Sequence, residues 1–391
     1  MLKAKHLLLC GLLLVSCSAL HAWGFWAHKR INRLAVFTLP PEMLVLYKTH
    51  LEYITEHAVG PDERRYAVDG EAPKHFIDID HYGRYPFDNV PRDWDQAVQA
   101  LSEDTLQAYG ILPYQLPREF YKLQQAFEDQ DLGAILRYSA DIGHYIGDAH
   151  VPLHTTENYN GQLSGQKGIH AFWESRLPEL FGERYDFFVG RCYYIDNVYK
   201  EGWDAVLESH LALDSVLRFE QQLNDRFAAD KKYGYESRNN ITVRAYSREY
   251  SSAYHQMLSG MVERRMCMAI KRIGAYWYTA WQNAGSPDLH ELVGQDIDPT
   301  PNQYEKRLNI IDREAFDIEF LFAPLRFPQQ NMCCSHSPRA NKSLPMGWKR
   351  TMSCVTPYSL SPTPKAQQLS RIQSIWNWVN VQWNKLVELS G

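Results

Sequence analysis

The sequence predicts an all-α fold, and three observations support that prediction. Apolar side chains recur at helical spacing along most of the chain, and the alternating runs typical of strands are scarce. Apolar residues make up 45% of the chain and charged residues 22%, as in a globular protein with a full core. We expect one multi-helix domain over residues 23–290, preceded by a leader at 1–22 and followed by a largely irregular extension at 291–391.

The leader has the pattern of a secretory signal peptide. Lys3 and Lys5 precede an apolar stretch from Leu7 to Leu20, and Ala22 supplies a small residue before Trp23. This stretch is too short, and wrongly flanked, to cross a membrane, which takes roughly 20 apolar residues. We therefore expect an exported protein, periplasmic or secreted, whose mature chain starts at Trp23.

A second interpretation of the leader rests on Cys17. The run Leu14-Val15-Ser16-Cys17 is similar to a bacterial lipoprotein cleavage site. Lipid anchoring at Cys17 would leave Trp23 inside the chain, without a free amine. We favour cleavage after Ala22, because the site chemistry below requires that amine.

Helix signals follow in order along the first half of the domain. Residues 24–58 form helices that break at Pro40-Pro41, and residues 59–92 are rich in the glycines and prolines of loops. Further helices are expected over residues 93–109 and 114–129. Asp131 is a suitable N-cap for a helix that reaches about Asp148, because Pro152 prevents its continuation.

The second half contains a loop, a short helix and two long amphipathic helices. Gly161, Gly165 and Gly168 indicate a loop before the helix that carries His170 and Glu174. The first long helix includes Leu213 to Phe227, and the second continues from Tyr246 to Trp281. Their aromatic side chains are interpreted as core.

The extension has a different composition. Residues 321–391 carry eight Lys or Arg and one acidic residue, a net charge of +7, against −12 for residues 1–320. Residues 331–364 show no hydrophobic period and are predicted to be disordered. A short helix with Trp376 and Trp383 would dock on the domain or make a transient membrane contact. No stable protein partner is implied.

Side chains that can bind zinc gather between His28 and Glu174. His144 with Asp148, and His170 with Glu174, stand four residues apart in helical segments, so each pair projects from one helix face. His154 follows just past the first of these helices. Imidazole and carboxylate are the ligands of water-activating zinc sites. Histidines outside this pattern, such as His150, are interpreted as ordinary core or surface residues.

These segments resemble the zinc-binding segments of one superfamily. It joins bacterial zinc-dependent phospholipase C to the fungal and plant single-strand-specific zinc nucleases. The segments are Trp23-Gly-Phe-Trp-Ala-His28, Pro61-Asp62-Glu63-Arg64-Arg65-Tyr66, His75-Phe76-Ile77-Asp78, His144-Tyr-Ile-Gly-Asp148-Ala-His-Val-Pro-Leu-His154 and His170-Ala-Phe-Trp-Glu174. The resemblance implies an all-helical fold that holds three zinc ions at the base of a cleft.

The resemblance also implies a ligand set for each ion. The first zinc ion would take Asp62, His75, His144 and Asp148. The second would take His154, His170 and Glu174. The third would take His28, the other oxygen of Asp148, and the α-amine and carbonyl oxygen of Trp23. An α-amine with a pKa near 8 can bind zinc, whereas an amide nitrogen is a poor ligand.

Three adjoining dications favour an anionic substrate, most naturally a phosphate ester. A zinc-bound water loses a proton near neutral pH, so hydroxide is available to attack phosphorus. We expect Asp148 to hold the first and third ions around this nucleophile, and Asp62 to orient or deprotonate it. The resemblance assigns Phe76 and Asp78 to substrate binding.

The sequence gives mixed signals on the phosphodiester itself. Glu174 and the short loop from His154 to His170 are similar to phospholipase C, and we favour a phospholipase C-like phosphodiesterase. The short gap from Trp23 to His28 is similar to the nucleases, so a single-strand-specific endonuclease and 3′-nucleotidase is the alternative. A net charge of −5 argues only against a general nucleic-acid-binding surface. A non-catalytic zinc-binding protein is a third hypothesis.

For several side chains near the ligands, the sequence leaves two roles open. Tyr145, Tyr159 and Phe172 would contact a choline-type headgroup or a base, or would pack in the core. The cations near the ligands would contact phosphate or remain solvated; they are Arg64, Arg65 and Lys74.

Overall fold

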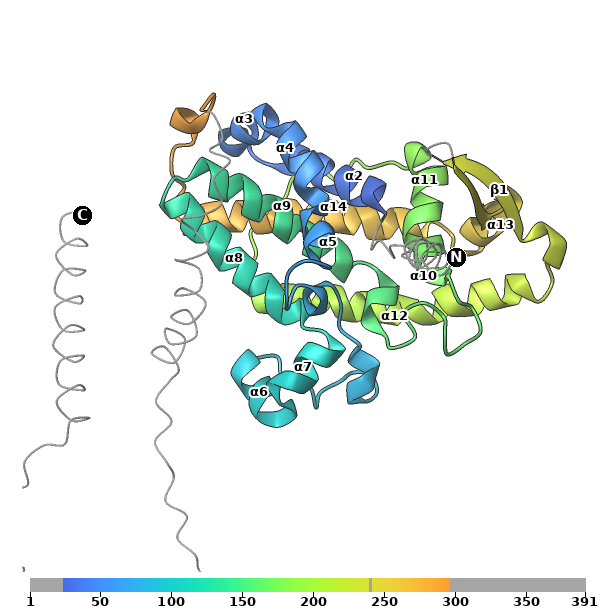
Figure 1. Cartoon of the computed structure of the whole chain (residues 1–391). Helices are drawn as coiled ribbons and strands as arrows, with labels where there is room; N and C mark the ends of the chain where they lie inside the picture. The colour runs from blue at the N-terminus through green and yellow to red at the C-terminus, as the bar shows by residue number, and fades with distance from the viewer. Residues whose placement is uncertain (1–23, 239–240, 296–391) are drawn as a thin grey trace, which may run out of the picture. The chain divides into compact units, whose positions relative to one another are not determined.

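A computed structural model describes residues 24–238 and 241–295 (Figure 1). This part of the chain is mostly helical, as predicted. The chain divides into two units, Met1–Ala323 and Pro324–Gly391, and all described residues belong to the first. The predictions for the leader, for Cys17, for Trp23 as a ligand and for the tail lie outside the described residues.

The helices are mostly short in the first half of the domain and longer in the second. In chain order they are α2 (Phe25–Ala35), α3 (Pro41–Thr49), α4 (Leu51–Glu56), α5 (Gly60–Arg64), α6 (Trp94–Leu101), α7 (Glu103–Tyr109), α8 (Leu112–Glu128), α9 (Leu132–Ala149), α10 (Ile169–Ala171), α11 (Leu177–Phe181), α12 (Val198–Asn224), α13 (Arg248–Met257) and α14 (Met261–Asn283). A π-helical turn, Phe172–Arg176, joins α10 to α11. None of the described helices combines the length and apolarity of a membrane span.

Helix α9 is the centre of the packing. Almost all of its side chains are buried, and α2, α8, α12 and α14 pack against it. Asp131 caps its start as predicted, since the carboxylate accepts a hydrogen bond from the Ala134 backbone N–H at 2.8 Å. A helix buried on all sides has little freedom to move. The side chains that α9 carries are therefore held at fixed positions.

Helix α2 approaches α9 closely at Gly147. A Cβ atom on Gly147 would lie 2.8 Å from the Ile31 side chain and 3.1 Å from the His28 ring. The absence of a side chain lets the His28 ring stack on that of His144, with their centroids 3.9 Å apart. This contact joins two sequence segments that are more than a hundred residues apart.

The described residues include one β-hairpin that the sequence analysis did not predict. Strands β1 (Tyr233–Arg238) and β2 (Ile241–Tyr246) pair antiparallel, with Tyr233 opposite Tyr246. Figure 1 shows the hairpin and α13 together at one end of the domain. The expected helix start at Tyr246 is therefore wrong. Helix α13 begins two residues later, where the Ser247 hydroxyl accepts a hydrogen bond from the Tyr250 N–H.

Two expected helices are broken by residues with positive φ. The helix expected over 93–109 is divided into α6 and α7 at Ser102, which has a φ of 69°. The second long helix is divided into α13 and α14 at Ser259 and Gly260, with φ values of 49° and 74°. Left-handed backbone cannot continue a right-handed helix, and hydrophobic periodicity does not report it.

Candidate metal centre

All eight predicted ligands within the described residues come together. Six segments supply them: α2, α5, the turn Ala72–His75, α9, the turn Pro152–Thr155, and α10 with the π-helical turn after it. Their ligand atoms form three groups in which every atom lies within 4.8 Å of the others. The groups are His28, His144 and Asp148; Asp62, His75 and His144; and His154, His170 and Glu174.

The first predicted ligand set surrounds His75. Its Nδ1 atom lies 2.9 Å from Asp148 Oδ2, 3.1 Å from His144 Nε2 and 3.7 Å from Asp62 Oδ1. His144 Nε2 is also 3.3 Å from Asp148 Oδ2, across the predicted four-residue spacing. All four predicted members of this set are therefore neighbours.

The other oxygen of Asp148 faces a different set. His28 Nε2 lies 3.4 Å from Asp148 Oδ1, whereas the Oδ2 atom belongs to the first set. One buried carboxylate therefore joins two groups, and it is the carboxylate that the sequence analysis assigned to the first and third ions. Trp23, the predicted third partner, lies outside the described residues. Its neighbour Gly24 packs against Ser175, beside the ligand Glu174, so the start of α2 is at the centre.

The second predicted set lies around Glu174. His154 Nε2 is 3.3 Å from Glu174 Oε2, and His170 Nε2 is 3.1 Å from Glu174 Oε1. Glu174 lies within the π-helical turn, a feature that is frequent at functional sites. Side-chain exposure is 13% for His170 and at most 2% for the other two, so solvent reaches this set beside His170.

Several of these spacings suit atoms that share one metal ion, whereas the 2.9 Å between His75 Nδ1 and Asp148 Oδ2 is a hydrogen-bond distance. Ligand atoms about 2.0–2.1 Å from a tetrahedral zinc ion stand roughly 3.3 Å apart, whereas charged hydrogen bonds are about 2.7–2.9 Å long. Four nitrogen–oxygen distances lie at 3.1–3.4 Å: His144–Asp148, His28–Asp148, His154–Glu174 and His170–Glu174. The donor set and its spacing therefore fit a metal centre.

Unsatisfied polar atoms support the same conclusion. Buried atoms without a hydrogen-bond partner among the described residues include both ring nitrogens of His28, Asp62 Oδ2, Asp148 Oδ1, His154 Nε2 and both oxygens of Glu174. Leaving such an atom unpaired costs on the order of 1–3 kcal/mol. So many in one place fit a site that holds a cation.

Backbone carbonyls orient three of the imidazole rings. His144 Nδ1 lies 2.8 Å from Ala58 O, His154 Nδ1 lies 2.6 Å from His75 O, and His170 Nδ1 lies 3.1 Å from Tyr159 O. A carbonyl accepts a hydrogen bond only from a protonated ring nitrogen, which leaves Nε2 of each ring with its lone pair toward the centre. This is the usual outer-shell arrangement of zinc-binding histidines.

Without a cation, protons take over its electrostatic role. Burial lowers the pKa of His144, but Asp148 and Asp62 outweigh burial and raise it to about 9. Burial alone would raise the pKa of Asp148, yet His144 and His154 hold it well below its usual range. The buried carboxylates therefore require a positive charge between them.

The remaining ligands are in forms suited to a metal. Burial, with His144 as a further cause, lowers the pKa of His28 to about 4. Burial also lowers the pKa of His75 to about 4, so both rings are neutral near pH 7. Burial raises the pKa of Asp62 to about 6, opposed by the nearby His144.

The predicted substrate residues lie beside the centre. Phe76 and Asp78 are both partly buried and lie one and three residues after His75. The Asp78 carboxylate has no hydrogen bond or ion pair within the described residues, and burial together with Asp80 raises its pKa to about 7. The His154 charge acts on Asp78, so Asp78 lies close to the second ligand group.

Of the three aromatic side chains considered as substrate contacts, two lie in the core and one lies at the surface beside the ligands. Tyr145 is buried, and its hydroxyl donates to the buried Glu71. Phe172 is also buried and stacks on Tyr246. Tyr159 remains 43% exposed, with its ring centroid 5.9 Å from that of His170. Among these three, Tyr159 alone has a surface available to a ligand.

Of the three cations considered as phosphate contacts, two are held by buried carboxylates and one is not. Arg64 pairs with the buried Asp141 at 2.9 Å, and Lys74 pairs with the buried Glu71 at 2.9 Å. The Arg65 side chain is partly buried and has no hydrogen bond or ion pair within residues 24–238 and 241–295. Its charge nevertheless acts on Asp62 and His75. Glu71, which holds Lys74 and Tyr145, had no sequence signal.

Comparison of the chain with protein-family models and with curated proteins gives no match.

Proposed function

We propose that this domain is a zinc-dependent phosphodiesterase, with a phospholipase C-like activity as the first choice of substrate class. The observation that carries the proposal is the joining of adjacent ligand groups through His144 and Asp148. Adjoining dications neutralise a phosphodiester and the charge that develops during its hydrolysis. Export to the periplasm or outside the cell is part of the same proposal.

The residues around the centre have distinct roles in this proposal. Bound zinc supplies a Lewis acid that polarises phosphate and acidifies water. Asp148 holds two ligand groups together with its two oxygens. Asp62 Oδ2 is buried and without a partner among the described residues, so it can accept a proton from the attacking water.

Arg65 is assigned to the substrate phosphate. Its guanidinium group is available, lies close to Asp62, and has the planar donor geometry that binds phosphate with two hydrogen bonds. A cation beside the ligands also attracts the anionic substrate to the centre.

Two observations bear on the substrate class. The Asp78 carboxylate lies among Asp80 and Glu157, and an acidic wall favours a substrate that carries a positive group beside its phosphate. This agrees with a zwitterionic phospholipid headgroup. The partly buried Phe76 next to Asp78 would also receive a nucleic-acid base, so the single-strand-specific nuclease remains the second candidate.

Removal and return of zinc tests the proposed activity. The zinc-loaded chain is expected to hydrolyse bis(p-nitrophenyl) phosphate, to lose the activity on chelation, and to regain it with added zinc. Phosphatidylcholine vesicles and single-stranded DNA, offered in parallel, distinguish the two substrate classes. A zinc-loaded chain that hydrolyses none of these substrates would support the non-catalytic zinc-binding protein instead.

Replacing Arg65 by Ala is expected to lower kcat/KM for bis(p-nitrophenyl) phosphate by roughly 10-fold or more, the scale of one lost charged hydrogen bond. Zinc content, measured by elemental analysis, should not change. Arg65→Lys should recover part of the loss, because it restores the charge without the planar geometry. Arg248→Ala, at an exposed position on α13, is the control and should have no effect. Equal values of kcat/KM for Arg65→Ala and the unaltered chain would contradict the assignment of Arg65 to the substrate phosphate.

A further inference from the structure

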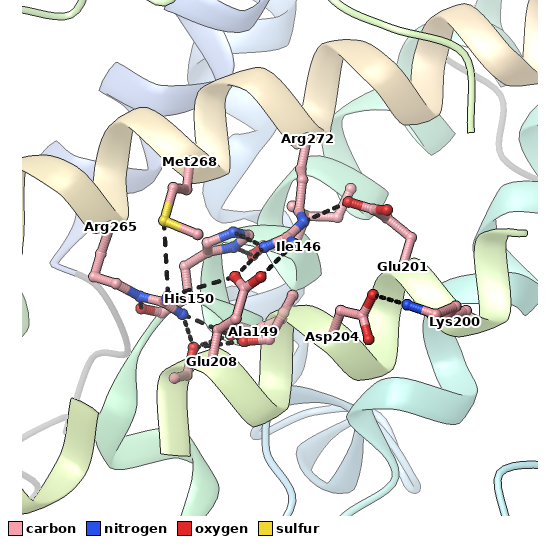
Figure 2. Close-up of polar contacts among 12 residues, drawn as sticks. Ile146, Ala149, His150, Lys200, Glu201, Asp204, Glu208, Arg265, Met268 and Arg272 are labelled. Atoms are coloured by element: carbon pink, nitrogen blue, oxygen red, sulfur yellow. Dashed lines mark hydrogen bonds and ion pairs between the residues drawn. The ribbon is translucent and has the colours of Figure 1, made fainter. Parts of the chain in front are cut away.

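The end of α9 presents side chains to two different environments. Asp148 faces the metal centre, and His150, two residues later, lies roughly 200° around the helix axis. His150 is buried between α12 and α14, outside the ligand groups, as the sequence analysis expected for this histidine. Figure 2 shows the contacts that surround it.

The carbonyl groups at the end of α9 all have partners. The last four carbonyls of a helix lack the usual backbone donors and require others. Ile146 O accepts from His150 Nδ1 at 2.7 Å, and Ala149 O accepts from Ser209 Oγ at 2.5 Å. Backbone N–H groups of residues 150 and 151 serve the carbonyls of Gly147 and Asp148. Side chains of His150 and Ser209 therefore satisfy two of these carbonyls, and backbone N–H groups satisfy the other two.

Two buried arginines of α14 contact His150. Arg265 Nε donates to His150 O at 3.0 Å, and Arg272 Nη1 donates to His150 Nε2 at 3.0 Å. Arg272 is itself held by Glu208, through two hydrogen bonds of 2.9 and 3.1 Å, and by Glu201 at 2.7 Å. Figure 2 shows Arg272 between His150 and these two glutamates of α12. Both ring nitrogens of His150 are thereby engaged, which fixes the ring.

These contacts are made at a residue that lies, in sequence, between two of the proposed metal ligands. His150 is two residues after Asp148 and four residues before His154, which belongs to the second ligand group. The backbone that connects the two ligands is thus fixed on the side away from the metal. Cationic groups at a helix C-terminus also interact favourably with the helix dipole.

We propose that His150, Arg265 and Arg272 form a positioning latch for the metal centre. Through the end of α9, the latch holds Asp148 and His154 in their ligand geometry before a metal binds. The affinity for zinc is then higher, because the ligands are already ordered before zinc binds. The inference rests on the proposed metal centre and is independent of the substrate.

The test compares two replacements of Arg272 with a matched control. Arg272→Gln removes the charge and most donors, whereas Arg272→Lys keeps a charged donor. The control is Asp204→Asn, which breaks the exposed Lys200–Asp204 pair on α12, also shown in Figure 2. The zinc dissociation constant is measured by competition with a chromophoric chelator, and Tm is measured with and without zinc.

Arg272→Gln is expected to bind zinc roughly 10-fold more weakly, the lower end of the effect of changes at direct outer-shell partners, because Arg272 acts on the ligands through His150. It should also reduce the rise in Tm that zinc produces. Arg272→Lys should retain most of the affinity, and Asp204→Asn all of it. Ser209→Ala, which removes the donor to Ala149 O, serves as the second variant if Arg272→Gln does not fold.

Two results would overturn the latch. One is an unchanged zinc dissociation constant in folded Arg272→Gln. The other is an equal drop in Tm with and without zinc, which would mean a structural role alone. If the unaltered chain binds no zinc at all, the proposed centre itself is wrong.

Discussion

Replacing Asp148 by Asn is expected to abolish phosphodiester hydrolysis and to release zinc from more than one position. The two oxygens of Asp148 face different ligand groups, so one neutral amide weakens both. The loss of kcat should exceed about 100-fold, the upper end for outer-shell changes at metal sites. Hydrolysis of bis(p-nitrophenyl) phosphate and elemental analysis of bound zinc measure the two effects. His144→Ala and His154→Ala should also abolish hydrolysis and lower bound zinc.

Asp131→Asn is a matched control for Asp148→Asn. It makes the same chemical change on the same helix, and Asn is as good an N-cap as Asp. It should leave zinc content and turnover unchanged. Full activity in Asp148→Asn, His144→Ala or His154→Ala would contradict the ligand assignment.

Removing zinc is expected to make the stability of the domain strongly dependent on pH above neutrality. In the metal-free chain, the carboxylates raise the pKa of His144 to about 9, above its ordinary value of 6.5. A group with a raised folded-state pKa stabilises fully below its unfolded pKa and loses this contribution as pH rises through its folded pKa. His154, whose pKa is also raised, acts in the same direction. The metal-free chain should therefore lose stability between pH 7 and about 9.

Thermal unfolding with and without zinc measures this effect. From pH 7 to 9.5 we expect Tm of the metal-free chain to fall by roughly 5 °C or more. The Tm of the zinc-loaded chain should fall much less, because the metal supplies the positive charge and His144 binds the metal without a proton. The metal-free His144→Asn variant should show a smaller decrease of Tm with rising pH. A slope that is the same with and without zinc would mean that no cation sits between Asp62 and Asp148.

The sequence by itself determined the helical class and, through the family resemblance, predicted the side chains that gather in the candidate metal centre. Helical periodicity, the Asp131 cap and the paired spacings are local properties, and a spacing of four on one helix is enough to join His144 to Asp148. The sequence analysis interpreted His150 as an ordinary core or surface residue, and the structure buries it. Sequence missed the β-hairpin and the breaks at Ser102 and Gly260, because short strands and left-handed residues leave little trace in hydrophobic periodicity.

Only the tertiary structure decided which neighbours each group has. Sequence could not show that Arg64 and Lys74 are held by Asp141 and Glu71 while Arg65 is available, because ion pairs form between distant segments. Nor could it show that His150 closes the end of α9 against two arginines of α14. The physical reason is that ligand identity is encoded by residue type and local spacing. Access, charge balance and rigidity depend on which helices pack together.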